Sequence, residues 1–250
     1  MKKRSSNKGY TIIEVMIFIV VSAFILVSAI AMFGGRQNQI QYEQGVRNFS
    51  LKIAEVTNSV SNGHFPDTGY SCTKSPGGDL TFTFSPGAEQ GTHDGCVFAG
   101  WAIERDSETS YRLTTIAAAR PDLGATMAVT DPEARLTPLT AASETIPTSW
   151  GLKINKIADE NGLVIKTILF LSDLGSGSSG NQNVGLYTSY NAMTFPINGD
   201  DLNRGGPVYI CLESAATDEK QAVIILGLEG RELTTTIDQD AKEEYTPQCD

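Results

Sequence analysis

The sequence predicts an α+β protein in which one long N-terminal helix precedes a β-rich globular head. Residues 12–33 form an apolar run with a single charge, and an amphipathic pattern then continues to residue 61. After Asn62-Gly63 the pattern changes to short β-rich runs separated by clusters of Gly, Pro, Asn, Asp and Ser. The 188 residues from Gly63 onward are enough to bury a core, as one large domain or as two closely packed lobes.

The apolar run has the length of a membrane span. The run has 22 residues, and a helix of about 20 residues is long enough to cross a hydrocarbon core about 30 Å thick. A short basic leader precedes the run, and only one basic residue immediately follows it, so the positive-inside bias predicts a cytoplasmic N-terminus and an extracytoplasmic head. These basic residues are Lys2, Lys3, Arg4 and Lys8 before the run and Arg36 after it. An ordinary secretory signal would have a shorter apolar core and a small-residue cleavage site after it, and neither is clear here.

Glu14 is the single charge in this run. A carboxylate in a membrane span costs about 2.5–3.5 kcal/mol on insertion scales, so it is rarely present without a partner. The sequence therefore predicts that a cation pairs with Glu14.

Residues 9–21, GYTIIEVMIFIVV, resemble the class III signal of type IV prepilins and type II secretion pseudopilins. That signal has a Gly at the cut, an aromatic or apolar residue after it, and Glu as the fifth mature residue. The resemblance implies that prepilin peptidase cuts between Gly9 and Tyr10 and N-methylates the new amine of Tyr10. It also implies that Glu14 pairs with the N-terminal amine of a neighbouring subunit during filament assembly. Tyr10 differs from the more usual Phe or Met but keeps the aromatic character.

The resemblance implies a pilin-like fold, with the helix packed on the head, and divides the chain into four parts. Residues 1–9 are the prepilin leader, residues 10–34 the transmembrane and filament-core helix, residues 35–62 its amphipathic half, and residues 63–250 the extracytoplasmic head. The matching signal covers only about the first 35 residues and does not specify what the head does. A single-pass anchor on an unrelated surface protein is the alternative.

The helix is expected to continue beyond the span. An apolar stripe recurs at intervals of three, four or six residues: Ile40, Val46, Phe49, Ile53, Val56 and Val60. Residues 11–61 then form one helix of about 75 Å at 1.5 Å per residue. Gly34, Gly35 and Gly45 are its expected weak points.

Strands are predicted throughout the head from short apolar or alternating runs. They cover residues 79–84, 96–103, 111–117, 150–157, 163–171, 185–195, 208–212, 222–228 and 232–237. Strict alternation in residues 81–84 predicts a half-buried strand, and the continuously apolar residues 222–228 predict a buried one. Residues 130–147, with three Pro, are expected to form a loop or crossing segment, and residues 175–183, GSGSSGNQN, a flexible tip.

Four cysteines lie on the outer side of the predicted membrane topology, which indicates two disulfides. They are Cys72, Cys96, Cys211 and Cys249. Three connectivities are possible, and nearest-neighbour pairing is preferred. A Cys211–Cys249 bond would resemble the C-terminal disulfide loop common in pilins. Zinc is the competing interpretation, but no CxxC or His pair accompanies these cysteines.

Charge argues against a nucleic-acid partner. The chain has 19 basic and 29 acidic residues, and without the four basic residues of the leader the balance is 15 against 29, a net charge of −14. Residues 208–232 resemble the C-terminal hairpin of minor pseudopilins of the H type, in which a Gly-Arg pair follows a buried strand. In DNA-binding members further basic residues follow that pair, whereas here Glu232 follows Gly230-Arg231. DNA binding needs clustered Lys or Arg at the phosphates, so no nucleic acid is expected.

No catalytic arrangement is predicted. His64 and His93 are interpreted as loop histidines, and the Asp67-Thr68-Gly69 triplet as a turn, because no second aspartate-bearing partner accompanies it. No cofactor is expected, although two oxygen-rich segments are weak calcium candidates. Their carboxylates are Asp200, Asp201, Asp238 and Asp240.

The resemblance and the residues together predict a non-enzymatic minor pilin or pseudopilin. Its expected partners are other pilin subunits, prepilin peptidase and an inner-membrane assembly platform. It would sit in the cytoplasmic membrane with the head outside until it enters a cell-surface or periplasmic filament. The alternative is an adhesin or ligand-binding head displayed on the same stalk. Its candidate aromatics are Trp101, Trp150, Tyr187 and Tyr190, although core packing is the default expectation for all four.

Overall fold

The computed structural model describes most of the chain. The described residues are 10–63, 70–75, 79–84, 95–119, 134–172, 184–190, 202–204, 206–215, 221–229, 232–238 and 246–249. They belong to two compact units, Met1–Glu43 and Gln44–Asp250.

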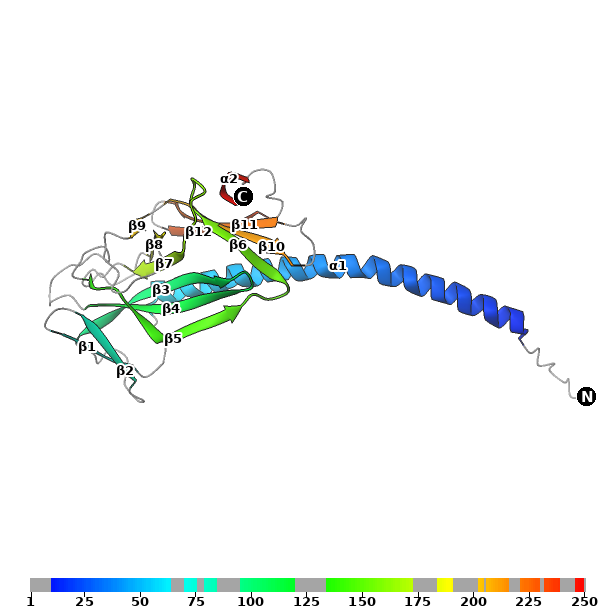
Figure 1. Cartoon of the computed structure of the whole chain (residues 1–250), viewed down its shortest axis with the longest axis horizontal. Coiled ribbons are helices and arrows are strands. Elements are labelled where there is room, and N and C mark those ends of the chain that lie inside the picture. Colours follow the sequence, from blue (N-terminus) through cyan, green and yellow to red (C-terminus); the bar gives the residue numbers. More distant parts are fainter. Residues whose placement is uncertain are drawn as a thin grey trace, which may run out of the picture. The chain divides into compact units, whose positions relative to one another are not determined.

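The first element is α1, a helix over Ile12–Ser61, drawn in blue to cyan in Figure 1. It confirms the predicted long helix and runs without interruption through Gly34, Gly35 and Gly45. At Gly45 the missing side chain has a packing role. A Cβ there would lie 2.9 Å from the Ser149 carbonyl oxygen and 3.3 Å from Leu152 Cβ. Glycine fits this position in the helix because Ser149 and Leu152 approach its backbone too closely for a side chain.

From Gln44 onward, α1 buries the predicted apolar stripe in the head. Val46 and Val60 are fully buried, and Phe49, Ile53 and Val56 are at most 5% exposed. The Phe49 ring meets the edge of the Tyr111 ring, with centroids 5.0 Å apart. Ile40 departs from the prediction, because it is 54% exposed.

The strands form three antiparallel sheets among the described residues. A six-stranded sheet has the order β5-β4-β3-β7-β8-β9, a four-stranded sheet the order β12-β11-β10-β6, and β1 pairs with β2. The strands of the six-stranded sheet are β3 Cys96–Ser107, β4 Ser110–Ala119, β5 Thr137–Pro147, β7 Thr167–Ser172, β8 Val184–Ser189 and β9 Asn203–Arg204. The others are β1 Tyr70–Lys74, β2 Leu80–Phe84, β6 Leu152–Ala158, β10 Val208–Ser214, β11 Gln221–Glu229 and β12 Glu232–Asp238.

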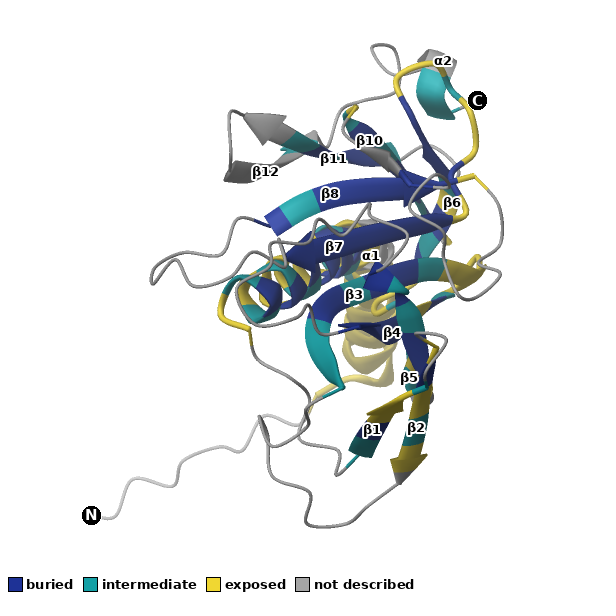
Figure 2. Cartoon of the chain, turned by 90° about the vertical axis from the view of Figure 1, so that its left-hand side faces the viewer, coloured by how far each residue is buried: buried dark blue, intermediate teal, exposed yellow. Residues whose placement is uncertain are grey.

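The six-stranded sheet carries apolar side chains on both faces. Tyr111 of β4 faces α1, so its neighbour Arg112 lies on the opposite face, as does Thr114. Part of that opposite face is a buried cluster that includes Ala102, Ile116, Ala118, Leu136, Leu169, Leu171 and Tyr187. Figure 2 shows β7 and much of β3, β4 and β8 in the dark blue of buried residues.

The prediction of a loop or crossing segment over residues 130–147 is wrong for residues 137–147. Thr137–Pro147 is β5, which pairs with β4 and lies at the edge of the six-stranded sheet. Pro138 and Pro147 suggested a loop, but an edge strand tolerates proline because one row of its amides has no strand to pair with. Residues 130–133 lie outside the described part of the chain.

Other boundaries also differ from the prediction. Residues 150 and 151 form a turn before β6, in which Trp150 and Gly151 have φ of 61° and 68° and the Leu152 amide donates to the Ser149 carbonyl. Residues 163–166 precede β7 and contribute only an isolated Ala158–Val164 bridge. The strand expected over 185–195 ends at Ser189, and residues 191–195 are not described. Besides β5, three of the described elements were not predicted: β1, β9 and the short helix α2, Thr246–Cys249.

The buried Tyr111 hydroxyl makes the head sensitive to alkaline pH. Burial, with the nearby charges of Glu144 and Glu55, raises the pKa of Tyr111 to about 12 from an ordinary value of 10.0. Because the folded state holds this proton more tightly, its contribution to stability is complete below pH 10 and is lost as the pH rises towards 12. We expect the midpoint of guanidinium unfolding to fall more steeply between about pH 10 and 12 in the wild type than in Tyr111→Phe.

Tryptophan fluorescence of the full chain in detergent measures these midpoints, because both tryptophans, Trp101 and Trp150, lie in the head. At pH 7, Tyr111→Phe is expected to differ from the wild type by less than about 1 kcal/mol. Parallel pH profiles for the two proteins would contradict the prediction.

Candidate functional site

The first part of α1 is an apolar surface without cover. Residues Ile12–Ile30 have a mean hydropathy of 2.7, and none of the segment is buried. Large side chains such as Ile12, Phe18 and Phe24 are 72–80% exposed. By length and composition this helix is able to cross a membrane, as an anchor or a signal sequence. A continuous apolar surface of this size needs an apolar environment.

Glu14 lies in the first turn of this helix and caps it. Its Oε2 accepts hydrogen bonds from the Thr11 amide and the Thr11 hydroxyl, both at 3.1 Å. In return the Glu14 amide donates to Thr11 Oγ1 at 3.3 Å. This reciprocal pattern is a capping box, in which two amides at the start of the helix find side-chain acceptors. The carboxylate also lies at the positive end of the helix dipole.

The sequence already contains the S/T-x-x-E pattern of a capping box, as Thr11-Ile12-Ile13-Glu14. It gives Glu14 a role within its own chain, in addition to the predicted pairing with a cation. The neighbouring Tyr10 is 86% exposed, and Gly9 lies outside the described residues.

Both predicted disulfides are present, in the preferred nearest-neighbour pairing. Cys72 bonds to Cys96 with Cα atoms 6.3 Å apart, and Cys211 bonds to Cys249 with Cα atoms 5.6 Å apart. The first links β1 to the start of β3. The second links α2 to the buried strand β10, so the end of the chain is tied to the four-stranded sheet.

Asp159 organises the turn that follows β6. Its Oδ1 accepts from the amides of Asn161 and Leu163 at 2.9 and 2.8 Å, and its Oδ2 accepts from the Tyr190 hydroxyl at 2.9 Å. Burial by itself would raise the pKa of Asp159, but these hydrogen bonds outweigh burial and lower it. The bond to Asp159 is in turn the main reason that the pKa of Tyr190 is raised. The carboxylate thus has a structural role in fixing this turn.

The candidate aromatic residues do not gather into a site. Tyr187 is buried and Trp101 is half-buried, in keeping with core packing. Trp150 and Tyr190 contradict that expectation, because they are 51% and 37% exposed. Trp150 lies in the turn before β6, whereas Tyr190 follows β8 and contacts Asp159.

A polar groove, formed by β3, β4 and β5, lies on the face of the six-stranded sheet away from α1. In the pairing of β4 with β5, Leu113 lies opposite Glu144 and Thr115 lies opposite Leu139. The four residues 140–143 of β5 therefore lie opposite the single residue Thr114 and form a bulge. The groove has a volume of about 350 Å³. Its lining combines the apolar Ala102 and Pro138 with the polar Glu104, Arg112, Thr114, Thr140 and Ser143.

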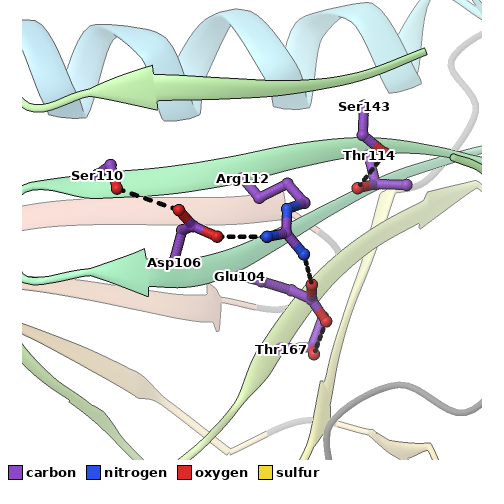
Figure 3. A network of polar contacts seen from close by, with 7 residues as sticks. All are labelled: Glu104, Asp106, Ser110, Arg112, Thr114, Ser143 and Thr167. Carbon is purple, nitrogen blue, oxygen red and sulfur yellow. Dashed lines mark hydrogen bonds and ion pairs between the residues drawn. The ribbon is translucent and has the colours of Figure 1, made fainter. Parts of the chain in front are cut away.

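The polar side chains at this groove hold one another in place (Figure 3). Arg112 lies between two carboxylates: its Nη2 donates to Asp106 Oδ1, and its Nη1 is 3.8 Å from Glu104 Oε2. Glu104 Oε1 also accepts from the Thr167 hydroxyl at 2.9 Å, and the hydroxyls of Thr114 and Ser143 bond to each other at 3.0 Å. Ion pairs as exposed as these contribute about 0–1 kcal/mol, so they orient the side chains more than they stabilise the fold.

Most of the remaining predicted site residues lie outside the described part of the chain. His64, His93, Asp67, Asp200, Asp201 and Asp240 lie outside the described residues. Asp238 is the last residue of β12, opposite Val223, and only its backbone is described. Within the described part of the chain, no group of three or more His, Cys, Asp or Glu side chains is placed to hold a metal ion.

The structure therefore defines an α+β protein with an N-terminal apolar helix, a mostly β head and two disulfides. Comparisons with protein-family models, with curated proteins and with solved structures find no match to this chain.

Proposed function

We propose that this protein is a minor pilin or pseudopilin, a structural subunit of a type IV pilus-like or type II secretion filament. Prepilin peptidase cleaves it after Gly9, the apolar half of α1 holds it in the membrane, and assembly transfers that helix into the filament core. The observation that carries the proposal is the combination of the GYTIIE segment, residues 9–14, with an exposed apolar helix that begins within it at Ile12.

The energetic argument concerns what surrounds α1 before and after assembly. In lipid the exposed side chains of Ile12–Ile30 contact acyl chains, and in a filament they would contact the same helices of neighbouring subunits. Because lipid and helix surfaces are equally apolar, this exchange needs packing and polar contacts to favour the filament. Pairing of Glu14 with a neighbouring N-terminal amine supplies such a contact.

The head also supports the proposal. The second half of α1 packs on a β-rich head through Val46, Phe49 and Ile53, and the Cys211–Cys249 bond fixes the end of the chain. Without residues 1–9 the chain has 241 residues, more than expected for a compact major pilin, which favours a minor, initiating or tip-proximal subunit. An enzymatic role is not proposed.

Intact mass spectrometry tests the proposal. The native chain is expressed with and without an active prepilin peptidase, beside Gly9→Ala and a control variant, Asn7→Ala, in the same leader. We expect the native chain and Asn7→Ala to lose residues 1–9 and to gain one methyl group when the peptidase is present. Gly9→Ala is expected to keep its leader, because the added methyl group lies at the position of the cut.

A native chain that keeps Met1–Gly9 beside an active peptidase would refute the filament proposal. The protein would then be a single-pass anchored surface protein. A pilus system and a secretion system are distinguished by whether the processed subunit is recovered in sheared surface filaments or in periplasmic ones.

A further inference from the structure

The groove at β3, β4 and β5 offers both donors and acceptors to a ligand. Arg112 has five N–H donors, and the described contacts direct its two Nη atoms to Asp106 and Glu104. Among the described residues, Glu104 Oε2 has one charged neighbour, Arg112 Nη1 at 3.8 Å, and the Thr140 side chain is exposed. The Thr114–Ser143 pair shares one hydrogen bond, which leaves one hydroxyl hydrogen and several lone pairs.

The charges at the groove discriminate against ionic ligands of either sign. An anion that approached Arg112 would also approach Glu104 and Asp106, which together outweigh the guanidinium by one negative charge. A cation that approached either carboxylate would meet Arg112 between them. A hydroxyl group is favoured, because it donates and accepts at the same atom without carrying charge.

The size and the floor of the groove indicate a small ligand that has apolar as well as polar surface. A volume of about 350 Å³ is at the lower end of the range for small-molecule sites. Ala102 and Pro138, both buried, form the apolar floor of the groove beside the polar side chains. A sugar ring has a matching pattern, with C–H groups on its faces and hydroxyls around its edge.

We propose that this groove is a binding site for a neutral mono- or disaccharide. Arg112 donates to the ring hydroxyls, and Glu104 and the hydroxyls of Thr140 and Ser143 complete the hydrogen bonds. The network of Asp106, Glu104 and Thr167 holds these groups in position before the ligand arrives, which lowers the entropy cost of binding. The site uses none of the exposed aromatic residues. Sugar binding at this groove involves only the head, so its test is independent of the filament proposal.

Saturation-transfer NMR of the full chain tests this site. The protein is kept in lauryldimethylamine oxide, a detergent without a sugar headgroup. The probes are the methyl glycosides of glucose, galactose, mannose and N-acetylglucosamine, together with maltose, lactose and chitobiose. We expect saturable binding of at least one neutral sugar with a Kd on the order of 1 mM, because the groove is small and open to water.

Two variants and one matched control locate the binding. Arg112→Gln and Thr140→Val are expected to weaken it, the first by about tenfold or more because a charged donor is lost. Arg105→Gln removes the same charge from the adjoining, opposite-facing part of β3 and is expected to leave the Kd unchanged. Thr140→Val changes one exposed hydroxyl at nearly constant volume, so its effect does not depend on how well the Arg112 variant folds.

Three outcomes would overturn the proposal. The first is no saturable signal from any neutral sugar at about ten times the expected Kd. The second is binding that Arg112→Gln and Thr140→Val leave intact. The third is tighter binding of sialyllactose than of lactose, which would show that the site prefers an anion.

Discussion

A Glu14→Gln chain is expected to reach the membrane normally and to enter filaments at least tenfold less than the wild type. In the proposed assembly, Glu14 pairs with a neighbouring amine in an apolar surrounding. Removing one partner of a buried ion pair typically costs about 3–5 kcal/mol, because the other charge is left uncompensated. Each 1.4 kcal/mol changes an equilibrium constant about tenfold, so we expect a large decrease in the fraction of subunits that enter filaments. The ratio of filament-bound to membrane-bound protein, measured by immunoblot after shearing, gives the result.

The capping box provides the control for this experiment. Glutamine keeps an oxygen that accepts from the Thr11 amide and hydroxyl, so Glu14→Gln changes the charge and preserves the cap. Thr11→Val does the opposite: it removes the hydroxyl that bonds Glu14 and keeps the carboxylate, at a cost of about 1 kcal/mol to the helix start. We expect Thr11→Val to reduce filament entry much less than Glu14→Gln. Equal losses would mean that Glu14 serves only as a helix cap.

The second large effect is expected at Gly100 of β3. Its φ of +154° is one that residues with a side chain rarely adopt, and a Cβ built there would lie 1.8 Å from the Phe170 carbonyl oxygen. That oxygen belongs to the backbone of the paired strand β7, so it cannot move aside without breaking the sheet. Gly100→Ala is therefore expected to destabilise the head by about 4 kcal/mol or more, a large part of the about 5–15 kcal/mol that holds a typical domain folded.

Gly151→Ala is the matched control for this substitution. Gly151 also has a positive φ, +68°, but the nearest atom to an added Cβ is Ala215 Cβ at 3.7 Å, an ordinary contact. Gly151→Ala is therefore expected to lower the free energy of unfolding only through backbone strain, by about 1–2 kcal/mol. Guanidinium unfolding of both variants, followed by tryptophan fluorescence, separates the collision from the strain. A Gly100→Ala midpoint no lower than that of Gly151→Ala would contradict the close approach of β3 and β7.

The elements that the sequence predicts correctly are those whose signal is local. The apolar run, the stripe from Val46 to Val60 and the buried run in β11 follow from composition and periodicity along one segment. The cap at Thr11 and Glu14 is equally local and was available from their spacing of three residues. The disulfide pairing was a preference among three, since cysteine spacing does not determine connectivity.

The edge strand β5 shows where local reasoning fails. Its Thr, Ala and Pro residues indicate a loop, and it becomes a strand because β4 supplies hydrogen-bond partners along one side. The bulge at residues 140–143, which opens the groove, arises from the register between these two strands. No property of either segment alone specifies that register.

Composition and periodicity along the chain thus specify the long helix, its exposed apolar half and the β-rich character of the head. The meeting of Arg112 with Glu104 and Asp106, and of Gly100 with the Phe170 carbonyl, depends on tertiary structure. The physical reason is that helix periodicity and hydropathy are properties of neighbouring residues. The groove and the close strand approach instead depend on strand register, which is set by hydrogen bonds and side-chain packing between segments.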